Sequence, residues 1–207
     1  KSVAIGANLY AGQTCISTQR VFVVKPEFEP FRDLLVKELN ALKSGDPADP
    51  EVSVGPIIGK GDYERIAAWV DEAVKGGAQL LAGGKPVDAA RHVYAATLLT
   101  GTKRSMKVDC AEVFGPITVI EPVKDFAEGI ARVNDSTYGL QAGVFTNNFA
   151  HVKQAHDGLE VGGVIINGIP GFRIDSMPYG GVKDSGLGRE GLKYAMEEMT
   201  EPRLIVY

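Results

Sequence analysis

From Tyr94 onward, the sequence alternates between short apolar runs and amphipathic segments. The apolar runs at 95–99, 117–120, 140–146 and 164–166 predict strands, while the segments that follow Asp125 and Asn148 predict helices. Val164-Ile165-Ile166 is apolar throughout, which is typical of a parallel strand covered on both faces. This rhythm predicts an α/β fold: an open, mostly parallel sheet with helices on both faces.

The rest of the chain fits the same fold class. Residues 1–11 predict the end of a helix that Gly12 terminates, and residues 21–24 predict a buried strand. Two amphipathic helices are expected next, at 26–42 and around 66–74, with a long loop at 44–59 between them. A short strand at 80–82, a final helix around 192–199 and a terminal strand at 203–207 complete the prediction.

The composition is that of an ordinary globular protein: 207 residues, of which 44% are hydrophobic and 23% charged. It supplies enough apolar mass for one large domain or two small ones. The net charge of −4 argues against a nucleic-acid surface. No apolar run approaches the ~20 residues of a membrane span. Two distant cysteines favour reduced thiols in the cytoplasm, and three scattered histidines give no metal site.

The first candidate for chemistry is Cys15, at the end of Gly12-Gln13-Thr14-Cys15. Its thiol stands at the boundary of two predicted elements, where backbone N–H groups can face a developing negative charge. A single cysteine among small residues is also typical of inert packing. The residues around Cys15 alone leave both interpretations open.

A second candidate is the segment Glu112-Val113-Phe114-Gly115-Pro116. In an extended segment, residues two apart point the same way, so Glu112 and Phe114 would share a face before Gly and Pro turn the chain. The carboxylate could accept hydrogen bonds from a ribose diol, and the phenyl ring could pack against a flat sugar or base. The alternative is an acid at a strand end beside a core phenylalanine.

Two more residues stand in positions that suit a ligand. Asn167 directly follows the predicted strand 164–166, and open α/β sheets bind ligands at the carboxyl ends of their strands. Arg173 lies between Phe172 and Ile174, where it could bind an anionic substrate. Pairing with the nearby Asp175 is its more ordinary alternative.

Residues 186–191 match the dinucleotide pattern G-x-G-x-x-G. Such a loop should follow a strand and open a βαβ unit, whereas Tyr179-Gly180-Gly181 precedes it and little sequence follows. We therefore expect these glycines to allow close backbone packing. Asn134-Asp135-Ser136 fits a glycosylation sequon, but a turn or capping role next to Gly139 is the better interpretation.

Taken together, several segments resemble the NAD(P)-dependent aldehyde dehydrogenase superfamily. They are Gly12-Gln13-Thr14-Cys15, the 112–116 segment, residues 134–140, Asn167, and residues 178–186 with Gly188-Arg189-Glu190. They span nearly the whole chain, and their order makes the resemblance specific. Residues 171–179 and 194–201 look most like the branch of lactaldehyde and non-phosphorylating glyceraldehyde-3-phosphate dehydrogenases.

The resemblance implies a role for each candidate. Cys15 would attack the aldehyde to give a thiohemiacetal, hydride would pass to NAD or NADP, and water would hydrolyse the thioester. Glu112 would hold the nicotinamide ribose, with Phe114 packed beside it, and Glu190 would serve a proton relay. Asn167 would support the active-site wall and, with Arg173, bind a small hydroxylated or anionic aldehyde.

The resemblance also implies parts upstream of Lys1: a general-base glutamate, an oxyanion asparagine and the NAD-binding domain. We therefore expect residues 1–202 to be the catalytic domain of a longer protein and residues 203–207 to be a C-terminal oligomerisation strand. On this view the chain alone is inactive. Its implied partners are a small aldehyde and further copies of itself.

Two other functions stay open. One is a thiol hydrolase or acyl transferase that uses Cys15 without a cofactor and needs a histidine base, which the segments around His92, His151 and His156 do not indicate. The other is a structural module without chemistry.

Overall fold

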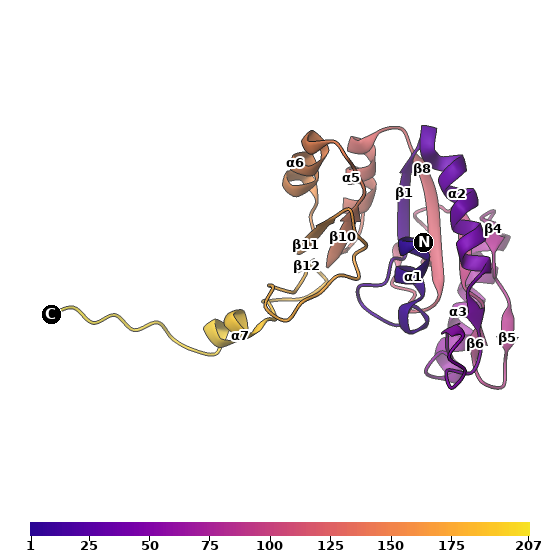
Figure 1. The fold of residues 1–207 in the computed structure, drawn as a ribbon, viewed down its shortest axis with the longest axis horizontal. Coiled ribbons are helices and arrows are strands. Elements are labelled where there is room, and N and C mark those ends of the chain that lie inside the picture. The colour runs from indigo at the N-terminus through magenta and orange to yellow at the C-terminus, as the bar shows by residue number, and fades with distance from the viewer. The chain divides into compact units, whose positions relative to one another are not determined.

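The computed structural model describes all 207 residues, and the chain divides into two compact units. The first unit spans Lys1–Val133 and the second Asn134–Tyr207 (Figure 1). The sequence led us to expect one catalytic domain over residues 1–202, so a division at the end of helix α5 (Phe126–Asn134) is a finding of the structure.

The first unit contains most of the secondary structure. In chain order it holds α1 (Ser2–Asn8), the 3-10 helix η1 (Leu9–Gly12), β1 (Arg20–Val24), α2 (Lys25–Asn40), β2 (Lys43–Ser44), β3 (Val52–Val54), α3 (Lys60–Lys75), β4 (Gln79–Ala82), β5 (Pro86–Asp88), β6 (Val93–Tyr94), β7 (Thr97–Thr100), α4 (Lys107–Cys110), β8 (Ile117–Val123) and α5. The loop predicted at 44–59 carries one small ladder, because β3 pairs with β2.

A four-stranded sheet with the order β1-β8-β7-β4 forms the centre of this unit. Strand β8 is parallel to both β1 and β7, while β4 runs antiparallel to β7 at the edge. The predicted mostly parallel α/β sheet is therefore confirmed. The apolar run that begins at Ile117 is the central strand, and its residues are nearly all buried because helices cover both faces.

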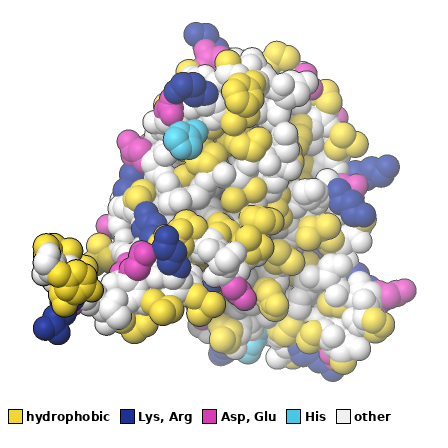
Figure 2. All heavy atoms as spheres, turned by 60° about the vertical axis from the view of Figure 1, so that its left-hand side comes forward, with side chains coloured by type: hydrophobic (Ala, Val, Ile, Leu, Met, Phe, Trp, Pro, Cys, Tyr) yellow, Lys and Arg dark blue, Asp and Glu magenta, His cyan; other side chains and the backbone are white.

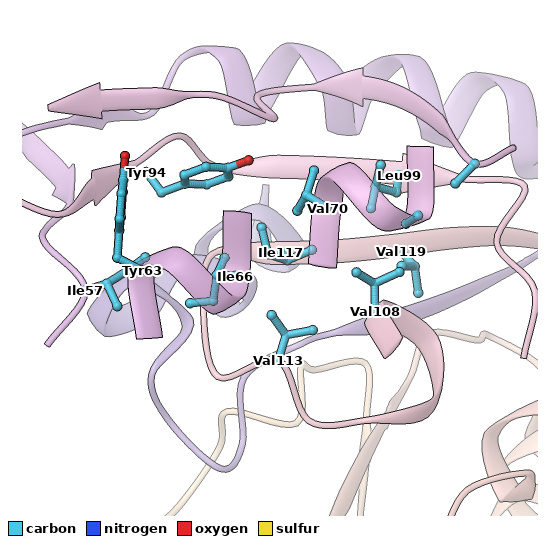
Figure 3. Close-up of a cluster of buried hydrophobic side chains, with 12 residues drawn as sticks. Ile57, Tyr63, Ile66, Val70, Tyr94, Leu99, Val108, Val113, Ile117 and Val119 are labelled. Carbon is cyan, nitrogen blue, oxygen red and sulfur yellow. The ribbon is translucent and has the colours of Figure 1, made fainter. Parts of the chain in front are cut away.

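The main core lies between this sheet and α3 (Figure 3). Ile66, Val70 and Ala73 recur at helical spacing along α3 and are almost fully buried against Ile117 and Val119 of β8. Helix α2 contacts β1, β8 and β4 and buries its own apolar residues, none of which belongs to the α3 cluster. The two helices thus cover different faces of the sheet, as the sequence predicted.

The second unit is built on a β-α-β segment. Its elements are β9 (Tyr138–Gly139), β10 (Gln141–Val144), α6 (Phe149–Gly158), β11 (Gly163–Ile166), β12 (Val182–Lys183) and α7 (Leu192–Glu198). Strands β10 and β11 pair in parallel, and Asn148 caps α6 by accepting a hydrogen bond from the backbone N–H of Ala150 at 2.9 Å. The strand, helix and strand predicted at 140–166 are confirmed, but β11 is only partly buried, with Ile166 37% exposed, so the prediction of a strand covered on both faces is wrong for this chain.

The predicted terminal strand at 203–207 does not form in this single chain. Residues 201–207 have no regular secondary structure (Figure 1). Leu204, Ile205 and Val206 are 87%, 73% and 82% exposed. Hydrophobic side chains also lie on the surface elsewhere on the face that Figure 2 shows. A strand needs hydrogen bonds to a neighbouring strand, and within this chain no segment pairs with residues 203–207. Their role in oligomerisation stays a prediction. None of the helices has the length and apolar character needed to cross a bilayer.

Candidate active site

Cys15 lies in an exposed turn that follows a strained stretch of backbone. The helix predicted over residues 1–11 ends at Asn8, and Tyr10, Ala11 and Gly12 follow in the left-handed region with φ of 50°, 57° and 72°. This conformation costs a non-glycine residue roughly 1–2 kcal/mol. The turn after it is closed by the Ser17 backbone N–H, which donates to the Thr14 carbonyl at 3.0 Å. The exposed thiol is thus presented on a tight turn rather than packed in the core.

Gly12 brings this turn against the second predicted motif. A Cβ atom placed on Gly12 would lie only 2.0 Å from the carbonyl oxygen of Gly115 and 3.0 Å from the nitrogen of Pro116. Only glycine permits such an approach between two backbones. The Cys15 turn and the segment Glu112–Pro116, far apart in sequence, are therefore in direct contact.

Gln13 holds the Cys15 turn from the other side. Its Nε2 donates hydrogen bonds to the carbonyls of Tyr10 at 2.9 Å and Pro56 at 3.2 Å. Its Oε1 accepts one from the N–H of Ile58 at 2.9 Å. These bonds help to offset the backbone strain that precedes Cys15.

Glu112 and Phe114 lie on either side of Val113, which is fully buried in the α3 core (Figure 3). Both neighbours are exposed, with Phe114 at 38%. Phe114 is therefore not a core phenylalanine, and that its ring shares a face with the Glu112 carboxylate stays a prediction. Phe114 itself has φ of 52°, so the extended conformation ends at Val113. An exposed carboxylate beside an exposed phenyl ring fits a ribose diol and a flat ring.

A buried cluster of charges next to this segment was not evident from the sequence. The side chain of Asp109 is 0% exposed and lies 3.7 Å from Arg20 Nε and 3.5 Å from an Arg104 nitrogen. Thr102 Oγ1 lies 3.1 Å from Asp109 and 2.8 Å from the buried Glu121. A buried carboxylate is tolerated only with such partners. The cluster anchors α4, which leads directly into Glu112, to the first residue of β1.

In the second unit, Asn167 stands where the sequence placed it, directly after β11. Its φ is 53°, and its backbone N–H donates to the carbonyl of Val144 at 2.7 Å. Its side-chain Oδ1 accepts from the N–H of Thr146 at 2.9 Å. Asn167 therefore joins the carboxyl ends of β10 and β11, and its contact with a substrate stays a prediction.

Arg173 and Glu190 come together in the same unit. The guanidinium lies 2.9 Å from the Glu190 carboxylate and 4.2 Å from the centre of the Tyr179 ring. Tyr179 and Glu190 are themselves paired by backbone hydrogen bonds of 3.0 and 2.6 Å. The ordinary pairing of Arg173 with Asp175 that the sequence suggested is thus replaced by a pairing with Glu190, because the backbone bridge places Glu190 beside Tyr179.

The glycine-rich loop at 186–191 is closed by its own chain. The backbone N–H of Arg189 donates to Glu198 at 3.0 Å, and a Cβ on Gly188 would lie 2.7 Å from the same carboxylate. The backbone of this loop thus packs against a carboxylate of its own chain. Close packing is therefore supported at Gly188 and at Gly191, where a Cβ would lie 2.7 Å from the Met177 carbonyl, but not at Gly186, which has open space around it. Asn134 likewise serves the fold, since its side chain bonds to the backbone of Gly158 and Glu160.

The predicted site residues thus form two groups. Cys15, Glu112 and Phe114 lie in the first unit, while Asn167, Arg173 and Glu190 lie in the second. Cys110 ends α4 and is partly exposed.

Comparison with known proteins identifies the family to which these residues belong. The model of the aldehyde dehydrogenase family matches residues 1–205. The 3-sulfolactaldehyde dehydrogenase of Priestia aryabhattai is 46% identical over 196 residues, which are 95% of this chain and 40% of that protein.

Solved structures agree with this match. Aldehyde dehydrogenase 21 of Physcomitrella patens, in complex with the reaction product succinate, is 36% identical at a TM-score of 0.92 over 96% of this chain and 41% of that one. Glyceraldehyde-3-phosphate dehydrogenase of Methanocaldococcus jannaschii, complexed with NADP, is 38% identical at a TM-score of 0.90. The match covers 96% of this chain and 42% of that one. The chain spans about 40% of the length of these relatives. It belongs to the aldehyde dehydrogenase family.

Proposed function

We propose that this chain is the thiol-bearing part of an NAD(P)-dependent aldehyde dehydrogenase that oxidises an aldehyde to a carboxylic acid. The observation that carries the proposal is the contact between Gly12 and Gly115. It brings the backbone that leads into the exposed Cys15 turn against Gly115, which directly follows the exposed Phe114. This is the juxtaposition that a thiol nucleophile and a nicotinamide-binding segment require.

The chemistry at Cys15 proceeds in three steps. The thiolate adds to the aldehyde carbon, and the carbonyl oxygen takes the negative charge and gives a thiohemiacetal. Loss of a hydride from that carbon leaves a thioester on Cys15. Water then adds to the thioester, the sulfur–carbon bond breaks, and the acid leaves with the thiolate restored. The backbone N–H of Cys15 supplies one donor to the oxyanion.

Glu112 and Phe114 are the residues that would hold the cofactor. The carboxylate accepts hydrogen bonds from ribose hydroxyls, and the phenyl ring packs beside the ribose and nicotinamide. When bound, the nicotinamide supplies the hydride acceptor. The NADP complex of the M. jannaschii relative supports this assignment, and the choice between NAD and NADP stays open.

We assign the substrate to the class of small aldehydes that carry an anionic group. The relatives support this class, since one is named for a sulfonated aldehyde, one holds succinate and one is named for a phosphorylated aldehyde. Arg173 is the residue that would bind this anionic group. Its surface ion pair with Glu190 stabilises the protein by only about 0–1 kcal/mol, so a substrate anion can replace Glu190 as its partner. Glu190 would then serve the proton relay, and Asn167 would keep the substrate-side loop in place.

This proposal places the protein in the cytoplasm as a homo-oligomer, and the 207-residue chain alone should not turn over. Only Glu112 and Phe114 of this chain would reach the cofactor, so we expect its affinity for NAD to be on the order of millimolar.

The assignment of Cys15 can be tested on the chain itself. Under limiting iodoacetamide, mass spectrometry should find Cys15 alkylated well before Cys110. Cys15→Ser should abolish the fast phase, and the matched variant Cys110→Ser should keep it. Preferential alkylation of Cys110 would remove the basis of the mechanism. In the longer protein, ester hydrolysis that is fast without NAD(P), together with no aldehyde oxidation, would favour the cofactor-independent thiol hydrolase instead.

A further inference from the structure

The side chain of Gln19 is bonded to the segment that carries Glu112. Its Nε2 donates to the carbonyl of Val108 at 3.0 Å and to the carbonyl of Ala111 at 2.8 Å. Its Oε1 accepts from the N–H of Val113 at 2.9 Å. The last two bonds go to the residues on either side of Glu112.

The backbone of Gln19 is fixed as well. Its carbonyl accepts from the N–H of Val119 at 2.8 Å, where the ladder between β1 and β8 begins. The next residue, Arg20, forms the ion pair with buried Asp109 in α4. The amide of Gln19 therefore reaches the Glu112 segment from the residue directly before β1, and both Gln19 and the neighbouring Arg20 are tied to other elements.

The Glu112 segment is thus attached to the Cys15 region at two points. Gln19, after Cys15, holds residues 108–113, and Gly12, before Cys15, touches Gly115. Glu112 and Phe114 lie between these two points. Phe114 also has a left-handed backbone conformation, which a loop adopts only when its surroundings impose it.

We propose that Gln19 is a positioning residue that sets the place of Glu112 and Phe114 relative to the Cys15 thiol. The inference rests on the proposed function, in which these two residues hold the nicotinamide ribose. It adds a residue that touches neither substrate nor cofactor and acts through the backbone on both sides of Glu112.

The chain offers a matched control in Gln13. Both glutamines use one amide group to make three hydrogen bonds to backbone, but Gln13 holds the Cys15 turn to Pro56 and Ile58. Gln19→Met and Gln13→Met thus remove the same number and kind of bonds from the two sides of the site. A general loss of structure would affect both variants alike.

The first measurement needs only the 207-residue chain. In Gln19→Met, hydrogen exchange of the backbone amides at 111–115 should quicken on the order of tenfold, since each lost bond is worth a factor of several. Exchange at 13–17 and alkylation of Cys15 should stay within twofold of the parent chain. Gln13→Met should show the reverse pattern. Unchanged exchange at 111–115 in Gln19→Met would overturn the proposal.

The second measurement uses the longer protein with its cofactor-binding part. Gln19→Met should raise the KM for NAD(P) on the order of tenfold while the KM for the aldehyde changes less than twofold. An equal rise of both KM values would reduce Gln19 to a general structural residue. Failure of the parent protein to oxidise any aldehyde would refute the proposed function instead. The hydrogen-exchange rates at 111–115 would still test whether Gln19 positions the Glu112 segment.

Discussion

The contact between Gly12 and Gly115 can be broken by adding a single methyl group. In Gly12→Ala, the new Cβ would start 2.0 Å from the Gly115 carbonyl oxygen, at a position whose φ is +72°. The variant therefore carries two penalties, one from the backbone conformation and one from the overlap. Two further glycines of the same unit separate these penalties.

Gly101→Ala is the control for backbone conformation alone. Its φ is +68°, but its Cβ would meet nothing closer than the Gly77 carbonyl at 4.0 Å. A left-handed alanine costs roughly 1–2 kcal/mol, of which about 0.4–1 kcal/mol is regained because the unfolded chain becomes stiffer. We therefore expect Gly101→Ala to lower the free energy of unfolding by about 1 kcal/mol.

Gly12→Ala should cost more, because the distance of 2.0 Å between the new Cβ and the Gly115 oxygen must grow to at least 3.4 Å before an ordinary van der Waals contact is restored. Overpacking of this kind adds roughly 1–3 kcal/mol, which gives a total of about 2–4 kcal/mol. Gly61→Ala is the control for adding a methyl group without either penalty, because Gly61 lies in α3 and has open space around it. We expect this variant to raise the free energy of unfolding by about 0.5–1 kcal/mol.

The assay is urea unfolding followed by the fluorescence of Trp69. It is the single tryptophan of the chain and packs against the α3 core, so it reports on the unit that holds all three glycines. The rate of Cys15 alkylation, measured below the transition, should change only in Gly12→Ala. Equal losses of stability in Gly12→Ala and Gly101→Ala would mean that the two loops are not in contact, and the argument for the site would fail.

Three other predictions follow from the structure. In the longer protein, Arg173→Met should raise the KM for an anionic aldehyde about tenfold and leave that for an uncharged one nearly unchanged; an equal effect on both would exclude a role in recognising the anion. Burial raises the pKa of Tyr94 to about 12 from its ordinary 10.0, so the unfolded state ionises first and stability should fall from pH 10 upward; in Tyr94→Phe that fall should lessen by up to about 2–3 kcal/mol at pH 12 in urea titrations, and an unaltered slope would contradict the assignment. Deletion of residues 203–207 should shift the protein toward monomer in light scattering without altering its circular dichroism, whereas an unchanged oligomer or a lost fold would show that the segment serves another purpose.

The fold could be predicted from sequence because its signals are local and repeated. The apolar run that begins at Ile117 predicts a buried strand. The helical spacing of Ile66, Val70 and Ala73 predicts a helix and the face that it buries. These patterns need only the neighbouring residues, so the structure could confirm them closely. At Glu112 and Phe114 the two-residue spacing left a core phenylalanine possible, and only the structure shows that Phe114 is exposed.

What the sequence could not supply are the pairings between distant segments. The partner of Arg173 is Glu190 rather than Asp175, because a single backbone bridge at Tyr179 decides the matter. The helix expected over residues 1–11 stops at Asn8, and the backbone that follows turns into the left-handed region where Gly12 meets Gly115. Each case depends on where another part of the chain lies.

The contact between Gly12 and Gly115 is the hardest pairing to predict from sequence, since no side chain takes part in it. Gly12 and Gly115 are two of 25 glycines, and nothing in their own sequence pattern distinguishes a glycine that turns from one that touches a distant backbone. The side chains that make the contact possible lie beside it: Gln13 fixes the turn before Cys15, and Gln19 fixes the segment around Glu112. Because an amide that bonds to backbone does not depend on the identity of the residues it holds, these hydrogen bonds of Gln13 and Gln19 place no demand on the side chains of the segments they hold. A family that binds chemically different aldehydes could therefore vary its pocket while this backbone assembly stays the same.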